Sequence, residues 1–138
     1  MRVLAVFFAT AFSVLISHAN ERAFFNIKII ESGVSANEDA IYVKGCKSFK
    51  PTPKQIQRYF LNAYPAPHWY GLHDRYSPCF ANGTADAPIF GKVKWAVDSG
   101  GFGSITWGDD VTVYVFHKKN GWFDPAACTY GLGHEGEC

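Results

Sequence analysis

The prediction of a β-sheet depends mainly on residues 92–116, KVKWAVDSGGFGSITWGDDVTVYVF. Polar and apolar residues alternate at its start, so Val93, Trp95 and Val97 fall on one face of an extended chain and both lysines on the other. This two-residue period is typical of a β-strand with one buried face. We therefore expect Trp95 in the core.

Two clusters of turn-forming residues divide the rest of this stretch into further strands. Residues 98–101 and 108–110 are rich in Asp, Ser and Gly, which favour tight turns. Residues 104–107 and 111–116 are rich in β-branched and aromatic residues, which favour strands. The second of these runs is apolar on both faces, and this predicts a central strand. The whole stretch predicts an antiparallel meander.

The flanking sequence extends this pattern in both directions. Residues 24–30 are apolar enough for a strand, residues 31–40 are polar and rich in turn formers, and residues 41–43 (Ile-Tyr-Val) predict a short strand. The Asn-Gly pairs at 82–83 and 120–121 each predict a hairpin turn. From residue 68 onward, the spacing of strand and turn segments describes a meander of about four or five strands.

One amphipathic helix is predicted before the meander. Thr52 can cap it, Pro53 suits its first position, and Gln55 stands where a capping box needs it. Pro65 and Pro67 are expected to end it. Its apolar face consists of Ile56, Tyr59, Phe60 and Ala63. The predicted fold is α+β, mostly β: an antiparallel meander of about four or five strands with this helix packed on it.

The N-terminus has the three parts of a secretory signal peptide. Arg2 supplies the positive charge, residues 3–16 are apolar apart from one Thr and one Ser, and residues 17–19 (Ser-His-Ala) form a cleavage site. An uncleaved membrane anchor is the alternative, but a spanning helix needs about 20 apolar residues. We expect removal of residues 1–19, leaving residues 20–138 as a single periplasmic or secreted domain.

Composition narrows the classes of partner. The chain has 13 Lys and Arg against 12 Asp and Glu, a formal net charge of +1 at pH 7. Non-specific binding of nucleic acids or anionic membranes needs a basic surface, so this balance argues against both. Aromatic residues make up 17% of the chain, and their bulk lets a short chain build a core.

The cysteines predict covalent cross-links. There are four, at Cys46, Cys79, Cys128 and Cys138. In an exported domain an even number indicates two disulfide bonds, for which three pairings are possible. We favour Cys46–Cys79, which closes the loop carrying the helix, and Cys128–Cys138, which fastens the C-terminus. A zinc-thiolate site is the alternative, but the sequence has no CxxC pair to form one.

Candidates for a binding site concentrate in residues 68–76. We predict a partner-binding surface formed by this segment, by Trp122 and by an acidic C-terminal loop, because Trp and Tyr anchor protein interfaces. Closure of that loop by a disulfide bond would preorganise it for binding. The predicted contact residues are His68, Trp69, Tyr70, His73, Asp74, Arg75, Tyr76, Trp122, His134 and Glu135.

No catalytic motif is found in the sequence, so no residue is assigned as catalytic and no cofactor or metal is expected. His68 and His73 are five residues apart, which fits neither the HExxH motif nor one face of a strand. The nucleophile motif GxSxG does not occur. A small hydrolase that uses His73 and Asp74 is the enzymatic alternative.

Several short runs carry a resemblance. They are Tyr59-Phe60 with Ala63, His73, Ser77-Pro78-Cys79, Gly83-Thr84, Trp95 and residues 103–107. In these runs the chain resembles small exported (periplasmic) proteins of Gram-negative bacteria, and its general form is similar to immunity proteins and cell-envelope inhibitors. The resemblance implies a stoichiometric inhibitor or immunity protein that binds an envelope hydrolase or a toxin. The second hypothesis is an envelope module that binds a ligand such as peptidoglycan or another glycan.

Overall fold

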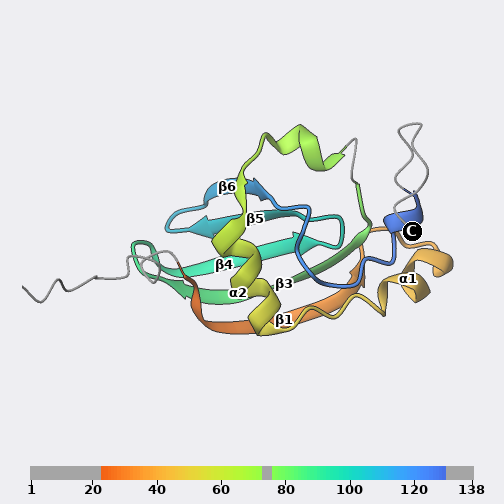
Figure 1. Ribbon diagram of the computed structural model, residues 1–138, viewed down its shortest axis with the longest axis horizontal. Coiled ribbons are helices and arrows are strands. Elements are labelled where there is room, and N and C mark those ends of the chain that lie inside the picture. Colours follow the sequence, from red (N-terminus) through yellow and green to blue (C-terminus); the bar gives the residue numbers. More distant parts are fainter. Residues whose placement is uncertain (1–22, 73–75, 130–138) are drawn as a thin grey trace, which may run out of the picture.

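The computed structural model describes residues 23–72 and 76–129, whose strands form one antiparallel sheet (Figure 1). The strands are β1 (Phe25–Ser35), β2 (Tyr64–Pro65), β3 (Cys79–Ala87), β4 (Gly91–Asp98), β5 (Phe102–Trp107) and β6 (Val111–Phe116). Their order in the sheet is β1-β3-β4-β5-β6-β2. The α+β, mostly β class is confirmed. In the described part the sheet has six strands rather than four or five, because the strand predicted at residues 24–30 joins the sheet as β1 and β2, which was not predicted, adds the opposite edge.

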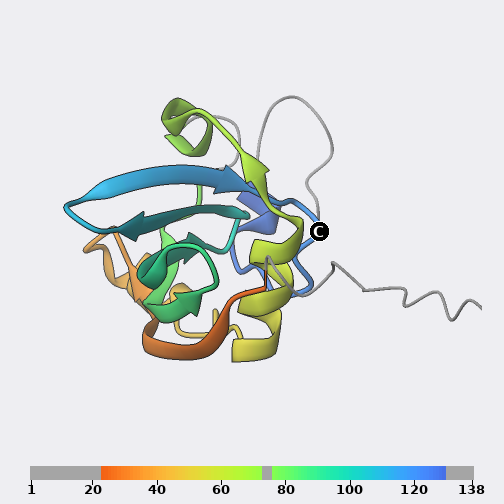
Figure 2. The same ribbon diagram turned by 90° about the vertical axis from the view of Figure 1, so that its left-hand side faces the viewer.

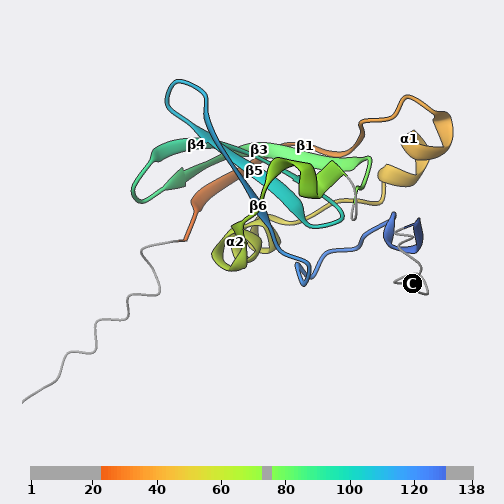
Figure 3. The ribbon, with the colours of Figure 1, turned by 90° about the horizontal axis from the view of Figure 1, so that it is seen from above.

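Four helical segments accompany the sheet in the described part of the chain. They are α1 (Ala40–Cys46), α2 (Pro53–Asn62) and the 3₁₀ turns η2 (His68–Leu72) and η3 (Ala127–Thr129). Figures 2 and 3 show α2 against one side of the curved sheet. α1 lies at the opposite end of the sheet from the β3–β4 and β5–β6 turns (Figures 1 and 3).

The capping box of α2 is confirmed. Thr52 Oγ1 accepts a hydrogen bond from the Gln55 amide at 3.3 Å, and Gln55 Oε1 accepts one from the Thr52 amide at 2.9 Å. Together they satisfy two backbone donors that a helix start leaves without partners. The helix buries Ile56 and Tyr59 against the sheet, as its apolar face predicts.

The core between α2 and the sheet is built around aromatic rings. The Tyr59 ring lies 5.1 Å from the Trp122 ring and 4.9 Å from the Phe60 ring, measured between centroids. Tyr59 Oη donates a hydrogen bond to the Gly101 carbonyl at 3.0 Å, so its one polar atom is satisfied. We call these rings the buried aromatic cluster: Phe24, Phe49, Tyr59, Phe60, Trp95 and Trp122. The predicted core position of Trp95 is confirmed.

The predicted Cys46–Cys79 disulfide is confirmed, and it joins the end of α1 to the start of β3. No cysteine in the described residues is free. The second predicted bond involves Cys138, which lies outside the described residues. The predicted signal peptide, residues 1–19, also lies outside them.

The strand predicted at residues 41–43 is wrong, since these residues belong to α1. Asp39 precedes the helix, and its Oδ1 accepts a hydrogen bond from the Ile41 amide at 2.9 Å. This N-cap favours a helix despite the β-branched residues that follow it. The turn-rich stretch at 31–40 is only partly a turn, because β1 continues to Ser35 through several irregularities in its pairing with β3.

The hairpin predicted at residues 82–83 is wrong, because this Asn-Gly pair lies within β3. A Cβ atom at Gly83 would collide with the Lys28 carbonyl oxygen of β1 and would lie 2.7 Å from the Trp95 ring. Glycine is therefore needed here for close packing rather than for a turn. The chain turns at residues 88–90 instead.

The prediction of a central strand holds only in part for β6. This strand lies between β5 and β2 and buries Val115 and Phe116, but Val111 is 51% exposed and β2 pairs with only two of its residues. The Asn-Gly pair at 120–121 forms no hairpin, since no strand follows in residues 117–129. Asn120 instead binds the local backbone, with Nδ2 donating to the His117 carbonyl at 3.2 Å. Asparagine commonly makes such local bonds in loops.

Candidate functional site

The sheet has two faces, and α2 packs on one of them, where Val93, Trp95 and Val97 lie. The strand register places the intervening residues on the opposite side, which we call the outer face. From β3 to β6 the outer-face residues are Phe80, Asn82, Thr84, Asp86, Lys92, Lys94, Ala96, Asp98, Phe102, Ser104, Thr106, Thr112, Tyr114 and Phe116.

Ring contacts hold η2 on the outer face beside β5 and β6. The His68 ring lies 4.5 Å from the Tyr114 ring, and the Tyr70 ring lies 5.0 Å from the Phe116 ring. The second pair meets edge to face, at 71°, a favourable geometry for aromatic rings. Two side chains of this short turn therefore attach it to the sheet.

The same turn presents two other side chains to solvent. Gly71 is buried against the Phe102 ring, where a Cβ atom would lie only 2.5 Å from ring carbons, so the backbone itself sits on the sheet. Trp69 and Leu72, in contrast, are 57% and 55% exposed. We call this pair the η2 surface. It is an apolar protrusion on an anchored segment.

An apolar groove borders η2 on the outer face. Its volume is about 270 Å³. Two of its lining rings, Phe102 and Tyr114, stack at 5.7 Å and 15°, and both also contact η2 residues. The full lining is Phe80, Ala96, Val97, Asp98, Phe102, Gly103, Ser104 and Tyr114. The lining of the groove thus combines aromatic walls with the Asp98 carboxyl group and the hydroxyl groups of Ser104 and Tyr114.

The carboxyl group in this groove is electrostatically unusual. Burial raises the pKa of Asp98 to about 8, and the nearby charge of Asp124 adds to the rise. Backbone N–H groups of Phe102, Gly100 and Gly101 act in the opposite direction, and the first of these donates to Asp98 Oδ1 at 3.1 Å. The carboxyl group therefore changes charge near neutral pH while it holds the β4–β5 turn.

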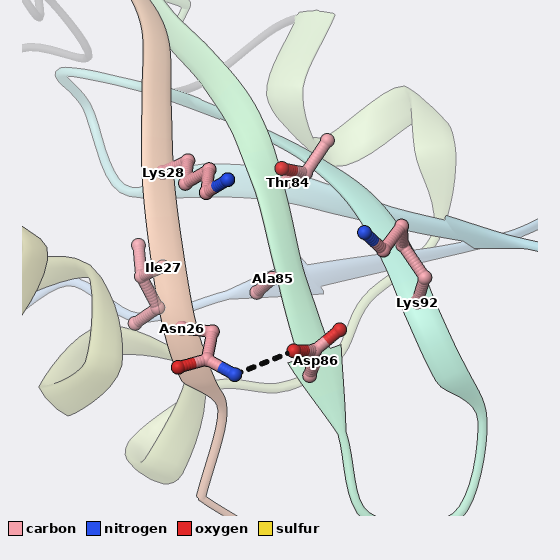
Figure 4. Close-up of a pocket in the computed structure, with 7 residues that line it drawn as sticks. All are labelled: Asn26, Ile27, Lys28, Thr84, Ala85, Asp86 and Lys92. Carbon is pink, nitrogen blue, oxygen red and sulfur yellow. Dashed lines mark hydrogen bonds between the residues drawn. The ribbon is translucent and has the colours of Figure 1, made fainter.

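A second, polar pocket of about 390 Å³ lies on the outer face near the β3–β4 turn (Figure 4). Lys28 of β1 and Lys92 of β4 lie on either side of Thr84 of β3 (Figure 4). Asn26 Nδ2 donates a hydrogen bond to Asp86 Oδ2 at 2.8 Å. The remaining lining residues are Ile27 and Ala85. This pocket offers both cationic and anionic groups to a ligand.

The structure brings together part of the predicted contact surface. His68, Trp69 and Tyr70 all belong to η2; Tyr70 is partly buried against Phe116, whereas His68 contacts the Tyr114 ring and is still exposed, and Trp69 is 57% exposed. Tyr76 is also largely exposed, at 47%. The predicted contact residues that lie outside the described residues are His73, Asp74, Arg75, His134 and Glu135.

The prediction that Trp122 contributes to a contact surface is wrong. Its ring is buried between Tyr59 and Phe49, and its Nε1 donates to the Ser99 carbonyl at 3.0 Å. The prediction rested on a hairpin at residues 120–121 that does not form. Without it, the loop turns the indole into the core rather than outward.

The sequence prediction missed both concave sites. The alternation at residues 92–97 does place Lys92 on the face opposite the core, and that is the one local signal for the polar pocket. Its partner Lys28 comes from a strand far earlier in the chain, and Asp98 reads as an ordinary turn residue. Sheet order, which the sequence does not give, brings these residues together.

Within residues 23–72 and 76–129, no group of three or more His, Cys, Asp or Glu is placed to hold a metal ion. No helix of this same part is long and apolar enough to cross a membrane. The chain matches no protein-family model, no curated protein and no solved structure. The functional inference therefore depends on the geometry of the outer face.

Proposed function

We propose that this chain is an exported, stoichiometric protein-binding domain of the inhibitor or immunity-protein type, without catalytic activity of its own. The η2 surface would form the centre of its contact with an envelope hydrolase or a toxin. The observation that carries the proposal is the exposure of Trp69 and Leu72, 57% and 55%, on a turn whose other rings are packed on the sheet.

Anchoring of η2 matters because binding has an entropic cost. Ordering a mobile, rotamer-rich side chain at an interface costs about 0.5–1.5 kcal/mol. A Trp on a turn already fixed by His68 and Tyr70 loses less freedom when a partner covers it. Trp is also among the residues that most often dominate interface energies. A partner with an apolar cleft that accepts the Trp69 ring fits this surface.

The remaining predicted contacts extend the same proposal. Tyr76 is exposed, and His73, Asp74 and Arg75 fall between it and η2 in the sequence. Polar and charged groups around an apolar anchor exclude water and add specificity. In this arrangement Trp69 supplies most of the binding energy, and the polar residues determine which partner is accepted.

We further propose export to the periplasm or the exterior, with a second disulfide between Cys128 and Cys138. The Cys46–Cys79 bond supports an oxidising compartment. It also removes those two cysteines as partners for Cys128, and no described cysteine is free. Thiol titration of the denatured, non-reduced protein should find no reactive thiol. A peptide map that joins Cys138 to another protein or leaves it free would contradict this pairing.

The groove beside η2 favours a second candidate function, binding of an envelope ligand such as a glycan. Sugars stack on aromatic rings, and the stacked Phe102 and Tyr114 rings form one wall next to Ser104. The groove is mainly apolar, however, and the protruding Trp69 suits a protein cleft better than a shallow sugar site. Protein binding is therefore the preferred proposal.

The test is a titration of the oxidised protein against an envelope hydrolase or toxin recovered by affinity capture. We expect a one-to-one complex, seen by calorimetry, that inhibits the captured protein. Trp69→Ala should weaken the complex by more than 1 kcal/mol, about fivefold or more. Ile89→Ala is the matched control, since Ile89 is an apolar residue 80% exposed at the distant β3–β4 turn.

Three other outcomes would decide against this proposal. Equal affinities of the wild type and the Trp69 variant would refute the η2 surface as the contact site. Binding of peptidoglycan fragments with quenching or protection of Trp69 fluorescence, and no protein partner, would favour the glycan-binding candidate instead. Turnover of an envelope substrate would refute both binding functions.

A further inference from the structure

The polar pocket lies far from the η2 surface on the same face. Lys92 lines this pocket and Asp98 lines the groove beside η2, six residues further along β4. At about 3.3 Å per residue this separation is about 20 Å. The two sites share no lining residue, so one can be altered without the other.

The cationic groups of the pocket converge on the strand between them. Figure 4 shows the Lys28 and Lys92 side chains on either side of Thr84, with both nitrogens directed toward the middle strand. The one hydrogen bond drawn among the lining residues joins Asn26 and Asp86. The two ammonium groups and the Thr84 hydroxyl therefore do not bond to one another, and all three remain donors for a ligand.

We propose that this pocket binds a small hydroxylated acid. Its acidic group would lie between Lys28 and Lys92 and accept hydrogen bonds from both ammonium groups and from the Thr84 hydroxyl. Its hydroxyl groups would donate to the Asp86 carboxylate, which Asn26 holds in position through its own hydrogen bond at 2.8 Å. Sugar acids and sugar phosphates both have this chemistry.

The size and polarity of the pocket support this class of ligand. A volume of about 390 Å³ is within the range of roughly 300–1,000 Å³ typical of small-molecule sites. An inorganic anion would leave most of this space empty. Asp86 would repel a ligand that is anionic throughout, whereas it accepts hydrogen bonds from hydroxyl groups. A ligand with one acidic group and several hydroxyl groups can bind the two lysines with the former and Asp86 with the latter.

The experiment uses the exported, oxidised protein labelled with ¹⁵N, titrated with four probes: glucuronate, glucose 6-phosphate, inorganic phosphate and glucose. We expect the first two to shift the amide signals of Lys28, Thr84 and Lys92 in a saturable way. Inorganic phosphate should bind at least about fivefold more weakly than these two probes, and glucose should cause no shift. A preference between glucuronate and glucose 6-phosphate distinguishes a carboxylate from a phosphate ligand.

Matched variants locate the site. Lys28→Ala and Lys92→Ala should each weaken glucuronate or glucose 6-phosphate binding about fivefold, the upper end for a solvent-exposed charge pair. Lys94→Ala is the control, because Lys94 is on the same strand and face but does not line the pocket. It should change affinity by less than about twofold. Lys28→Gln keeps most of the length of the side chain and a polar end but removes the charge, and it should match Lys28→Ala if loss of charge is the cause.

Three results would overturn the proposal. They are an absence of saturable shifts with both hydroxylated acids, equal binding of inorganic phosphate, and equal losses in Lys94→Ala and Lys92→Ala. The last would show attraction to the general charge of the face rather than to this pocket. None of these results depends on Trp69, so the proposed protein-binding function is tested separately.

Discussion

Aromatic residues lie on both faces of the same sheet, but their exposure differs sharply. Under α2, the Tyr59 ring is fully buried and Trp122 is 9% exposed. On the other side of the sheet, Trp69 is 57% exposed although its neighbours His68 and Tyr70 are packed on the strands. The same residue types therefore serve the core on one face and a solvent-facing protrusion on the other.

The difference follows from what covers each ring. α2 lies across the sheet and carries Tyr59 into a site enclosed by Phe60 and Trp122 (Figure 1). η2 is a single short turn. Its His68 and Tyr70 rings contact the sheet, and the turn is too short to cover the Trp69 ring as well. Burial of an aromatic ring stabilises the fold, whereas an exposed ring on a fixed turn is available for binding.

The largest effect is expected where the buried aromatic cluster is disrupted. Tyr59→Ala should lower the free energy of unfolding by about 3–5 kcal/mol, because it leaves a cavity and removes the hydrogen bond to Gly101. Tyr64→Ala is the control; Tyr64 is 53% exposed, and its loss should cost under about 1 kcal/mol. Urea denaturation measures both. Similar losses would show that the two faces do not differ in stability.

The next effect is a pH dependence caused by Asp98, which lines the groove on the outer face. Asp98 has its pKa raised to about 8 in the folded protein, above the ordinary 3.8. A raised carboxyl pKa means that the folded state holds the proton more tightly. The protonated Asp98 carboxyl group therefore makes its full contribution to stability below about pH 4. As the pH rises toward 8 this contribution is lost, and the free energy of unfolding falls by at most about 1.4 kcal/mol per pH unit.

Asp98→Asn should therefore flatten the decline in unfolding free energy between pH 5 and pH 8, because the amide cannot ionise. Its Oδ1 can still accept from the Phe102 amide. Asp109→Asn, in the exposed β5–β6 turn, is the control and should leave the slope unchanged. Denaturation curves at several pH values measure the slope. An unchanged slope in Asp98→Asn would show that another group is responsible.

A smaller effect is expected at the start of the helix that covers the core. Thr52→Ala removes the acceptor of the Gln55 amide and should cost about 1 kcal/mol. Lys54→Ala, an exposed change in the same first turn, should have little effect. Chemical denaturation with unchanged far-UV circular dichroism measures both. A neutral Thr52→Ala would mean that tertiary packing alone holds α2, and that its cap adds nothing.

The sequence was sufficient for the fold where local and tertiary preferences agree. The alternation at 92–97, the turns at 98–101 and 108–110, and the capping box at Thr52 all formed as predicted. It failed where a local signal was overridden. The Asn-Gly pair at 82–83 has a hairpin composition, but Gly83 is needed for the close approach of β1 to β3.

The candidate site could be predicted only in part, for a related reason. Residues 68–76 were identified from their aromatic composition, but composition does not show which rings face the sheet. Trp69 protrudes and Tyr70 does not because Phe116 lies under the latter. For the polar pocket the sequence contains one local signal, the position of Lys92 opposite the core. Lys28 comes to lie near Lys92 only because β3 pairs with both β1 and β4.

The smallest effect on stability, and the sharpest test of the comparison, is expected at Trp69. Trp69→Ala should change the free energy of unfolding by less than about 0.5 kcal/mol, as for most surface substitutions, while Trp122→Ala should cost about 3–5 kcal/mol as a core truncation. Both variants remove one indole, so they are matched in chemistry and differ in the face of the sheet.

Acrylamide should quench Trp69 more strongly than Trp122, and Trp69→Ala should remove the most readily quenched part of the fluorescence. A loss of stability above about 1.5 kcal/mol in Trp69→Ala would show that the indole stabilises the fold. The η2 surface would then be part of the structure rather than a site kept open for a partner.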